Sequence, residues 1–110
     1  MTVAELADKL HLEVLVSDGD DRQVTGGYCG DLLSWVMGRA AEGDAWITVM
    51  GNLNAVAVAV LADVACIILS ESAALDADAK MRAVQQEVPV CRSAEDTFTL
   101  CCKLGALLQP

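Results

Sequence analysis

Five residues stand directly behind apolar segments of the chain and are the first candidates for ligand chemistry: Gly51, Asn52, Asn54, Ser70 and Arg92. Free amides at the start of a helix bind anions, and a glycine lets a ligand approach the backbone closely. The side-chain amides of Asn52 and Asn54 can recognise a nucleotide or another polar ligand; alternatively, Asn54 caps a helix and Asn52 turns the chain. These five residues are therefore the candidate small-ligand site, with an adenine nucleotide as one candidate ligand, and the capping interpretation stays open beside it.

The five cysteines are a second source of chemistry. Cys29 precedes Gly30 at an expected helix start, where the helix dipole favours the reactive thiolate. Cys66 lies in an apolar segment and is expected in the core. Cys101 and Cys102 are adjacent on an expected helix, so their side chains point about 100° apart and cannot chelate one metal ion together. A redox role of Cys29 stays open as an alternative, and no metal site is predicted.

The chain contains no recognisable catalytic constellation. The P-loop pattern requires a glycine before its lysine, and none of the three lysines follows a glycine. His11 is the only histidine and stands at an expected helix-to-strand junction without a partnered nucleophile. The acidic run Asp18–Asp21 lacks the glycine and the distal glutamate that an EF-hand needs. We therefore expect that the protein is not an enzyme and holds no cofactor or metal.

The composition excludes several classes of partner. The 110 residues include seven Lys and Arg and sixteen Asp and Glu, which gives a formal net charge of −9. Nucleic acids and anionic membranes are bound by clustered cations, so neither is an expected partner. The longest uncharged run is interrupted by Gly51, Asn52 and Asn54, so it does not read as a membrane span. The first residues lack the features of a signal peptide, and we expect a cytoplasmic protein with reduced cysteines.

Caps, glycines and apolar periodicity divide the chain into alternating helices and strands. Helices are expected at Thr2–Leu10, Asp31–Ala41, Asn54–Asp63, Asp76–Gln86 and Ser93–Leu104. Strands are expected at Leu12–Val16, Val24–Tyr28, Ala45–Met50, Ala65–Leu69 and Val88–Cys91. Three successive strand–helix units imply parallel strands joined by right-handed crossovers. We therefore expect one α/β domain over residues 1–110, in three layers, with a small and mainly parallel sheet flanked by helices.

The segment Ala55–Ala62 is apolar on every side, although it is expected to be a helix. A helix without a polar face must be covered on both sides. Either neighbouring helices of the same chain cover it, or a second copy of the chain does. The second interpretation predicts an interface formed by Val56, Val58, Val60 and Leu61.

Three stretches resemble the DRTGG-domain family, and together they extend along essentially the whole chain. They are Leu12–Val16 with Asp21-Arg22 and Val24–Tyr28; Gly30–Ser34 with Gly43–Thr48; and Asn54–Ala59 leading into Ile67–Leu69. In the family, an Asp-Arg pair usually follows the strand corresponding to Ala45–Met50, and Thr-Gly-Gly follows the one corresponding to Ala65–Leu69. This chain has Asn52-Leu53-Asn54 and Ser70-Glu71-Ser72 at those places.

The resemblance implies an α/β fold similar to the N-terminal domain of HPr kinase/phosphorylase. Family members also occur within phosphotransacetylases and within regulatory, CBS-containing pyrophosphatases, where they tend to form dimer contacts and carry no catalytic residues. Similar short, stand-alone members tend to be encoded near iron-hydrogenase subunits, which implies a hydrogenase-type partner enzyme.

We therefore expect a non-catalytic regulatory or interaction module that forms a homodimer through the helix Asn54–Asp63. The first alternative is a sensor of a small ligand or adenine nucleotide that docks against Asn52, Asn54, Ser70 and Arg92. The second alternative is a thiol-based redox factor that uses Cys29.

Overall fold

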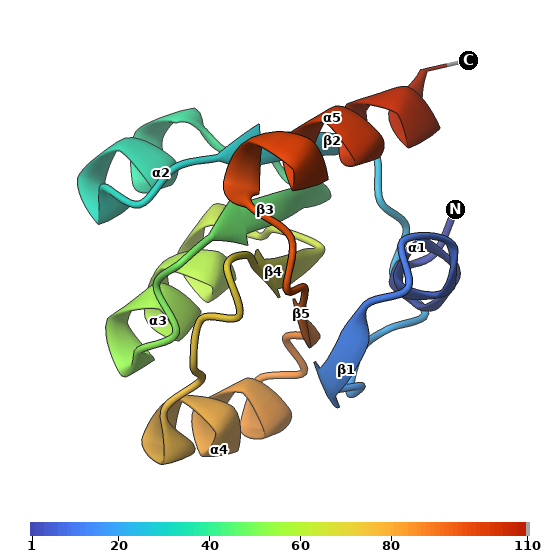
Figure 1. The fold of residues 1–110 in the computed structure, drawn as a ribbon. Coiled ribbons are helices and arrows are strands. Elements are labelled where there is room, and N and C mark those ends of the chain that lie inside the picture. The colour runs from blue at the N-terminus through green and yellow to red at the C-terminus, as the bar shows by residue number, and fades with distance from the viewer. Residues whose placement is uncertain (110) are drawn as a thin grey trace.

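A computed structural model describes residues 1–109, and these residues form one five-stranded sheet with helices on both faces. The strands are β1 (Glu13–Val16), β2 (Gly26–Cys29), β3 (Asp44–Thr48), β4 (Cys66–Leu69) and β5 (Val90–Arg92). They are arranged in the order β1-β5-β4-β3-β2 (Figure 1). Strands β2 to β5 run parallel to their neighbours, and β1 pairs with β5 antiparallel. The expected α/β class with a mainly parallel sheet is confirmed.

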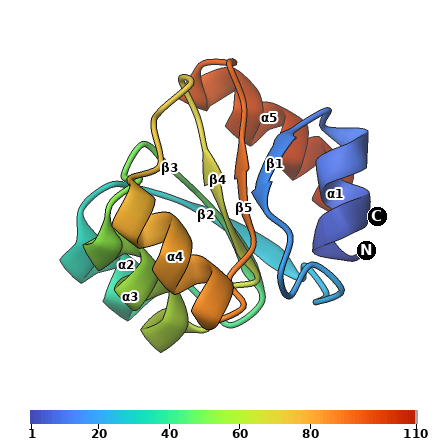
Figure 2. The same ribbon diagram turned by 90° about the horizontal axis from the view of Figure 1, so that it is seen from below.

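The helices divide between the two faces of the sheet. They are α1 (Val3–Lys9), α2 (Leu33–Arg39), α3 (Leu53–Ala62), α4 (Ala77–Gln85) and α5 (Thr97–Leu108). Figure 2 shows α2, α3 and α4 together on one face and α1 with α5 on the other. Each pair of neighbouring parallel strands is joined by a helix that crosses one face of the sheet. These helices form one outer layer, the sheet forms the middle layer, and α1 with α5 form the other outer layer. Within the described residues, no helix combines the length and the apolar character that a membrane crossing requires.

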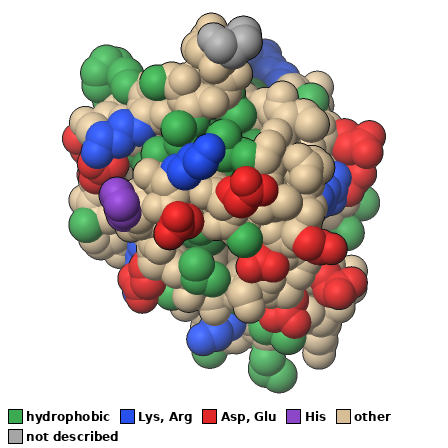
Figure 3. All heavy atoms as spheres, turned by 90° about the vertical axis from the view of Figure 1, so that its right-hand side faces the viewer, with side chains coloured by type: hydrophobic (Ala, Val, Ile, Leu, Met, Phe, Trp, Pro, Cys, Tyr) green, Lys and Arg blue, Asp and Glu red, His purple; other side chains and the backbone are tan. Residues whose placement is uncertain are grey.

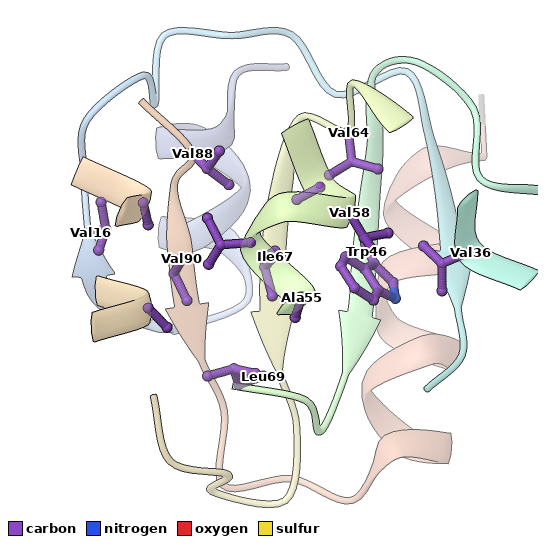
Figure 4. Packing of buried hydrophobic residues seen from close by; sticks show 14 residues of the cluster. Val16, Val36, Trp46, Ala55, Val58, Val64, Ile67, Leu69, Val88 and Val90 are labelled. Carbon is purple, nitrogen blue, oxygen red and sulfur yellow. The ribbon is translucent and has the colours of Figure 1, made fainter. Parts of the chain in front are cut away.

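Every residue of β3 and β4 is buried, which explains why β4 and the central residues of β3 are apolar on both faces. Successive side chains alternate between the two faces. Trp46 and Ile67 point toward α3, as Figure 4 shows, whereas Ile47 and Ile68 belong to the cluster under α1 and α5. The indole nitrogen of Trp46 donates a hydrogen bond to the carbonyl of Gly30 at 2.9 Å. The sheet is therefore covered on both faces by a single chain.

Helix α1, which the sequence predicted, begins with a capping box. The hydroxyl of Thr2 accepts a hydrogen bond from the amide of Glu5 at 3.2 Å, and the Glu5 carboxylate accepts one from the amide of Thr2 at 3.1 Å. The Thr2 amide and hydroxyl bonds lower the pKa of Glu5. His11 follows the helix in the left-handed conformation (φ 53°), and its amide donates to Asp8. The histidine therefore helps to end the helix, at the junction where the sequence placed it.

Helix α3 begins one residue earlier than predicted and is capped by Asn52. The side-chain oxygen of Asn52 accepts a hydrogen bond from the amide of Ala55 at 2.9 Å. The prediction that Asn54 caps this helix is wrong, because Asn54 already lies in the first turn with its side chain at the surface. The helix ends at Asp63, which adopts the left-handed conformation (φ 59°) at the C-cap.

Helix α5 is shifted toward the C-terminus relative to the prediction. Its N-cap is Asp96, which accepts a hydrogen bond from the amide of Thr99 at 3.0 Å, whereas the hydroxyl of Ser93 accepts one from Glu95 in the preceding turn. The helix also continues through Gly105 to Leu108 instead of ending near Leu104. Leu104 and the residues after Gly105 pack on the core beneath them, and this packing outweighs the low helix propensity of glycine.

Candidate functional site

The carboxyl end of β3, where the sequence predicted a ligand site, is filled by the protein's own backbone. A Cβ atom added at Gly51 would lie 1.8 Å from the carbonyl oxygen of Ala74. The amide of Asp76, at the start of α4, donates a 2.8 Å hydrogen bond to the carbonyl of Gly51. The glycine therefore permits close approach of the segment before α4, which occupies the place expected for a ligand.

The carboxyl end of β4 is tied to the start of α5. Ser70 is buried, and its hydroxyl lies 2.6 Å from that of Thr97. The amide of Thr97 donates to the carboxylate of Glu71 at 2.9 Å, and Glu71 and Ser72 both adopt positive φ angles (60° and 55°). Their amides donate to the carbonyls of Glu95 and Ser93 at 2.9 Å. The Ser70 hydroxyl, the Glu71 carboxylate and the amides of Glu71 and Ser72 are thus engaged within the protein.

Arg92, at the end of β5, is also engaged within the chain. Its guanidinium donates two hydrogen bonds of 3.1 Å to the carboxylate of Glu13 on the neighbouring strand β1. A third, longer bond of 3.5 Å reaches the carbonyl of Ala73. A bidentate pair of this kind holds the cation in place and offsets its charge.

Asp31 completes the closure of this edge, and sequence reasoning did not single it out. Its carboxylate accepts hydrogen bonds from the hydroxyl of Thr48 at 2.7 Å and from the amide of Val49 at 3.0 Å. These bonds fasten the loop after β2 to the end of β3. An isolated aspartate between a strand and a helix gives no signal in the sequence for such a contact.

The structure thus brings the predicted ligand residues to one edge of the sheet but uses their polar groups internally. Gly51, Asn52, Ser70 and Arg92 each have a partner within the chain, whereas Asn54 is exposed. Parallel sheets usually bind ligands beyond the carboxyl ends of their strands because loops leave free amides there. Here those loops are bonded to one another.

The predicted interface residues of α3 fall into two groups. Val56 and Val58 face the sheet and are buried within a single chain, so their assignment to an interface is wrong. Val60 and Leu61 lie on the outer face, where 39% and 70% of their surface is exposed. Neighbouring elements of the same chain therefore cover only one side of this apolar helix.

The outer face of α3 and the adjacent face of α4 enclose a shallow hollow of about 180 Å³. We call it the α3–α4 hollow; it is lined by Ala57, Val60, Leu61, Arg82 and Gln86. The floor comes from apolar side chains of α3, and the polar rim comes from α4. This combination is common at protein–protein contacts, where an apolar centre is surrounded by polar groups.

A larger cavity of about 300 Å³ lies between the edge strand β2 and helix α5. We call it the β2–α5 cavity; its lining is mainly apolar and includes Ile47, Leu104, Leu108 and the thiols of Cys29 and Cys101. Cys29 is the last residue of β2, and α2 begins only at Leu33. The prediction that Cys29 lies at a helix start is therefore wrong, because the intervening residues form a loop.

The remaining thiols differ in their accessibility. Cys66 is buried as predicted, and burial raises its pKa well above the ordinary range. Burial also raises the pKa of Cys91 to about 11 and that of Cys101 to about 12. Cys102 is exposed. Within the described part of the chain, no group of three or more His, Cys, Asp and Glu side chains converges as a metal site.

Four of the seven basic side chains have a charged or aromatic partner within the chain, Arg92 among them. Arg22 bonds Asp63 at 2.8 Å, Lys103 pairs with Glu95, and Arg39 stacks over the Trp35 ring at 3.8 Å. Figure 3, which views the side bearing α1 and β1, shows acidic groups scattered among basic and apolar ones. This face offers no cluster of cations for a polyphosphate backbone.

The fold defines a small three-layer α/β domain with a mixed five-stranded sheet. The chain belongs to the DRTGG domain family, whose model matches residues 5–107. It is similar in structure to the CBS and DRTGG domains of the regulatory region of Clostridium perfringens pyrophosphatase, complexed with the activator diadenosine tetraphosphate. That similarity has a TM-score of 0.73 at 17% sequence identity and covers 94% of this chain but 45% of the other. This chain thus spans less than half the length of that structure. None of the curated proteins matches the sequence.

Proposed function

We propose that this protein is a non-catalytic regulatory module that acts as a homodimer through the α3–α4 hollow. The observation that carries the proposal is the contrast between two surfaces. The sheet edge that commonly binds ligands in α/β proteins is bonded internally, whereas Leu61 on α3 is 70% exposed. Large apolar groups gathered around a hollow favour a protein partner over a polar metabolite.

A second copy of the chain is the partner that best fits this surface. A twofold axis near Leu61 would place the exposed side of α3 against its own counterpart, which gives a self-complementary contact. The membership of the chain in the DRTGG domain family supports a regulatory assignment, since the similar pyrophosphatase structure is described as a regulatory region. The likeness to the N-terminal domain of HPr kinase/phosphorylase, a cytoplasmic location and a hydrogenase-type partner enzyme belong to the same proposal and rest on the family resemblance and the sequence.

The dimer is tested by sedimentation equilibrium on the wild type and on Leu61→Asp. We expect a dimer for the wild type and a monomer for Leu61→Asp, because a carboxylate in the apolar contact would lose its hydration. Phe98→Asp is the matched control: Phe98 is 77% exposed but lies on α5, across the sheet. It should remain dimeric. A wild type that stays monomeric at high concentration, or a Leu61→Asp variant that still dimerises, would contradict the proposal.

Adenine-nucleotide sensing is the second candidate function, because the similar regulatory region is complexed with diadenosine tetraphosphate. In this chain the ligand would meet the exposed Asn54 at the start of α3 and displace Glu13 from Arg92. Thermal shift with diadenosine tetraphosphate and with ATP tests this, since a ligand at a hundredfold its Kd stabilises by about 2.7 kcal/mol. Asn54→Ala should abolish the shift and leave the unliganded melting temperature nearly unchanged. No shift with either nucleotide removes this candidate.

A further inference from the structure

The edge strand β2 and helix α5 pack against each other with little between them. A Cβ atom added at Gly27 would lie 3.0 Å from a methyl carbon of Leu104 and 3.6 Å from one of Leu108. The missing side chain at Gly27 thus lets the helix lie close to the strand, and Cα atoms of the two elements approach within 8 Å. A larger residue at position 27 would hold the helix farther from the strand.

The packing brings two thiols face to face. Side chains two residues apart on a strand share a face, so Cys29 points to the same side as Gly27, toward α5. Residues three apart on a helix also share a face, so Cys101 lies one turn before Leu104 on the side that meets β2. Both cysteines line the β2–α5 cavity. Hydrogen bonding to Cys29 contributes, after burial, to the raised pKa of Cys101, which agrees with the placement of both side chains on the wall of this cavity.

We propose that Cys29 and Cys101 form an oxidation site, in which a peroxide converts the two thiols into an intramolecular disulfide. In the first step the Cys29 thiolate attacks one peroxide oxygen, which yields a sulfenic acid at Cys29 and releases hydroxide or water. In the second step the Cys101 sulfur attacks the Cys29 sulfur, the S–S bond forms, and a second water leaves. Overall, two thiols lose two protons and two electrons, and hydrogen peroxide is reduced to two water molecules.

Exposure decides the order of the two steps. Cys29 is exposed and meets the oxidant first, whereas Cys101 is partly covered and lies on the same cavity wall, where it can attack the sulfenic acid. Cys66 and Cys91 are buried in the strands beneath the cavity and stay reduced. Cys102 is exposed but follows Cys101 on the helix, so its side chain points away from β2.

The bond would fasten the last helix to the edge strand. Because both cysteines line the cavity, the disulfide would also remove two thiols from its wall and fix its width. The site therefore adds a covalent, reversible state to a domain whose other surfaces show no catalytic arrangement among the described residues. This inference is independent of the proposed homodimer, since the α3–α4 hollow lies on the other face of the sheet (Figure 2).

The experiment oxidises the reduced full-length chain with a small molar excess of hydrogen peroxide and maps the products by mass spectrometry under non-reducing conditions. We expect an intact monomer mass lower by two hydrogen atoms, a cross-linked peptide pair containing Cys29 and Cys101, and full reversal by dithiothreitol. Mapping in the wild type needs no variant, so a folding defect cannot hide the result. A bond that instead joins Cys102 to another cysteine, or oxidation that stops at isolated sulfinic acids, would overturn the proposal.

Three single variants provide the controls. Cys29→Ser and Cys101→Ser should each abolish the intramolecular bond, whereas Cys102→Ser should form it at the wild-type rate. Circular dichroism before oxidation shows that each variant is folded, and Cys101→Ala is the substitute if the serine disturbs the partly buried position. Loss of the bond in Cys102→Ser, or its survival in Cys29→Ser, would assign the chemistry to a different pair and refute the inference.

Discussion

Replacing Gly51 by alanine tests whether the carboxyl edge of the sheet is closed as the structure has it. The new Cβ would lie 1.8 Å from the carbonyl oxygen of Ala74, 2.8 Å from its carbonyl carbon and 3.1 Å from the Cα of Leu75. All three are backbone atoms, so no side-chain rotation can relieve the overlap. The segment before α4 must move by more than an ångström, which also breaks the hydrogen bond from Asp76 to the carbonyl of Gly51.

The expected cost follows from these two effects. Overpacking in a well-packed region costs about 1–3 kcal/mol, and a lost internal hydrogen bond costs about 1 kcal/mol. We therefore expect Gly51→Ala to lower the free energy of unfolding by about 2–4 kcal/mol, and the melting temperature by roughly 10–20 °C for a chain of this size. That is a large part of the stability of a small domain, which is about 5–15 kcal/mol.

The assay is urea unfolding followed by circular dichroism, with Gly38→Ala as the matched control. A Cβ at Gly38 would meet no atom within 4 Å, and Gly38 lies within α2. Alanine is favoured over glycine inside a helix by about 1 kcal/mol, so the control should be slightly more stable than the wild type. If Gly51→Ala were as stable as Gly38→Ala, the edge would be open, and a ligand site at Asn52 and Asn54 would again be the better hypothesis.

Three further outcomes are expected. Asp31→Ala should lower the free energy of unfolding by about 1–3 kcal/mol, because a charged acceptor of two hydrogen bonds is lost, and Asp31→Asn should cost less; urea midpoints measure both. The Thr99 hydroxyl and then its amide lower the pKa of Asp96, so this carboxylate stabilises the fold above its unfolded-state pKa and the contribution is lost as the pH falls through the lower folded value. Asp96→Asn should therefore flatten the decline of the urea midpoint below about pH 4. Iodoacetamide at neutral pH should label Cys102 in the folded protein and leave Cys66 and Cys91 unlabelled until urea is added; labelling of either buried thiol at the rate of Cys102 would contradict the burial described.

The regular part of the fold could be predicted because its physics is local. Caps and apolar periodicity located all ten elements to within a few residues. The errors in the element boundaries occur where tertiary contacts determine where a helix begins or ends. Asn52 and Asn54 are equally good caps, and the choice depends on where the backbone leaves β3, which is set by the packing of Gly51 against Ala74.

The site could be predicted less well than the fold, because its contacts join distant parts of the chain. Residues at the strand ends were placed correctly at one edge of the sheet, yet no pattern in the chain indicated that Glu13 would pair with Arg92 from an antiparallel strand. The placement of Cys29 and Cys101 on one cavity wall depends on the register of α5 along β2. The only indication of this placement in the sequence is Gly27, which leaves room for a helix on the strand. The glycine can be interpreted in this way only once α5 is known to lie there.

The internal bonds at the strand ends determine where function can reside in this domain. A parallel sheet leaves free amides at its carboxyl edge, and a ligand site there needs at least some of them unpaired. Here Glu71 and Ser72 adopt positive φ angles, which non-glycine residues adopt at an energetic cost, and their amides bond the turn before α5. Because Glu71 and Ser72 adopt this costly conformation to form the bonds, the internally bonded edge of the sheet is the stable arrangement. The surfaces left for interaction are then the helical faces, where oxidation at the β2–α5 cavity and association at the α3–α4 hollow would act on opposite sides of the same rigid sheet. Dimerisation should therefore be equally strong in the reduced and the oxidised protein, and a difference between them would place the dimer contact at β2 instead.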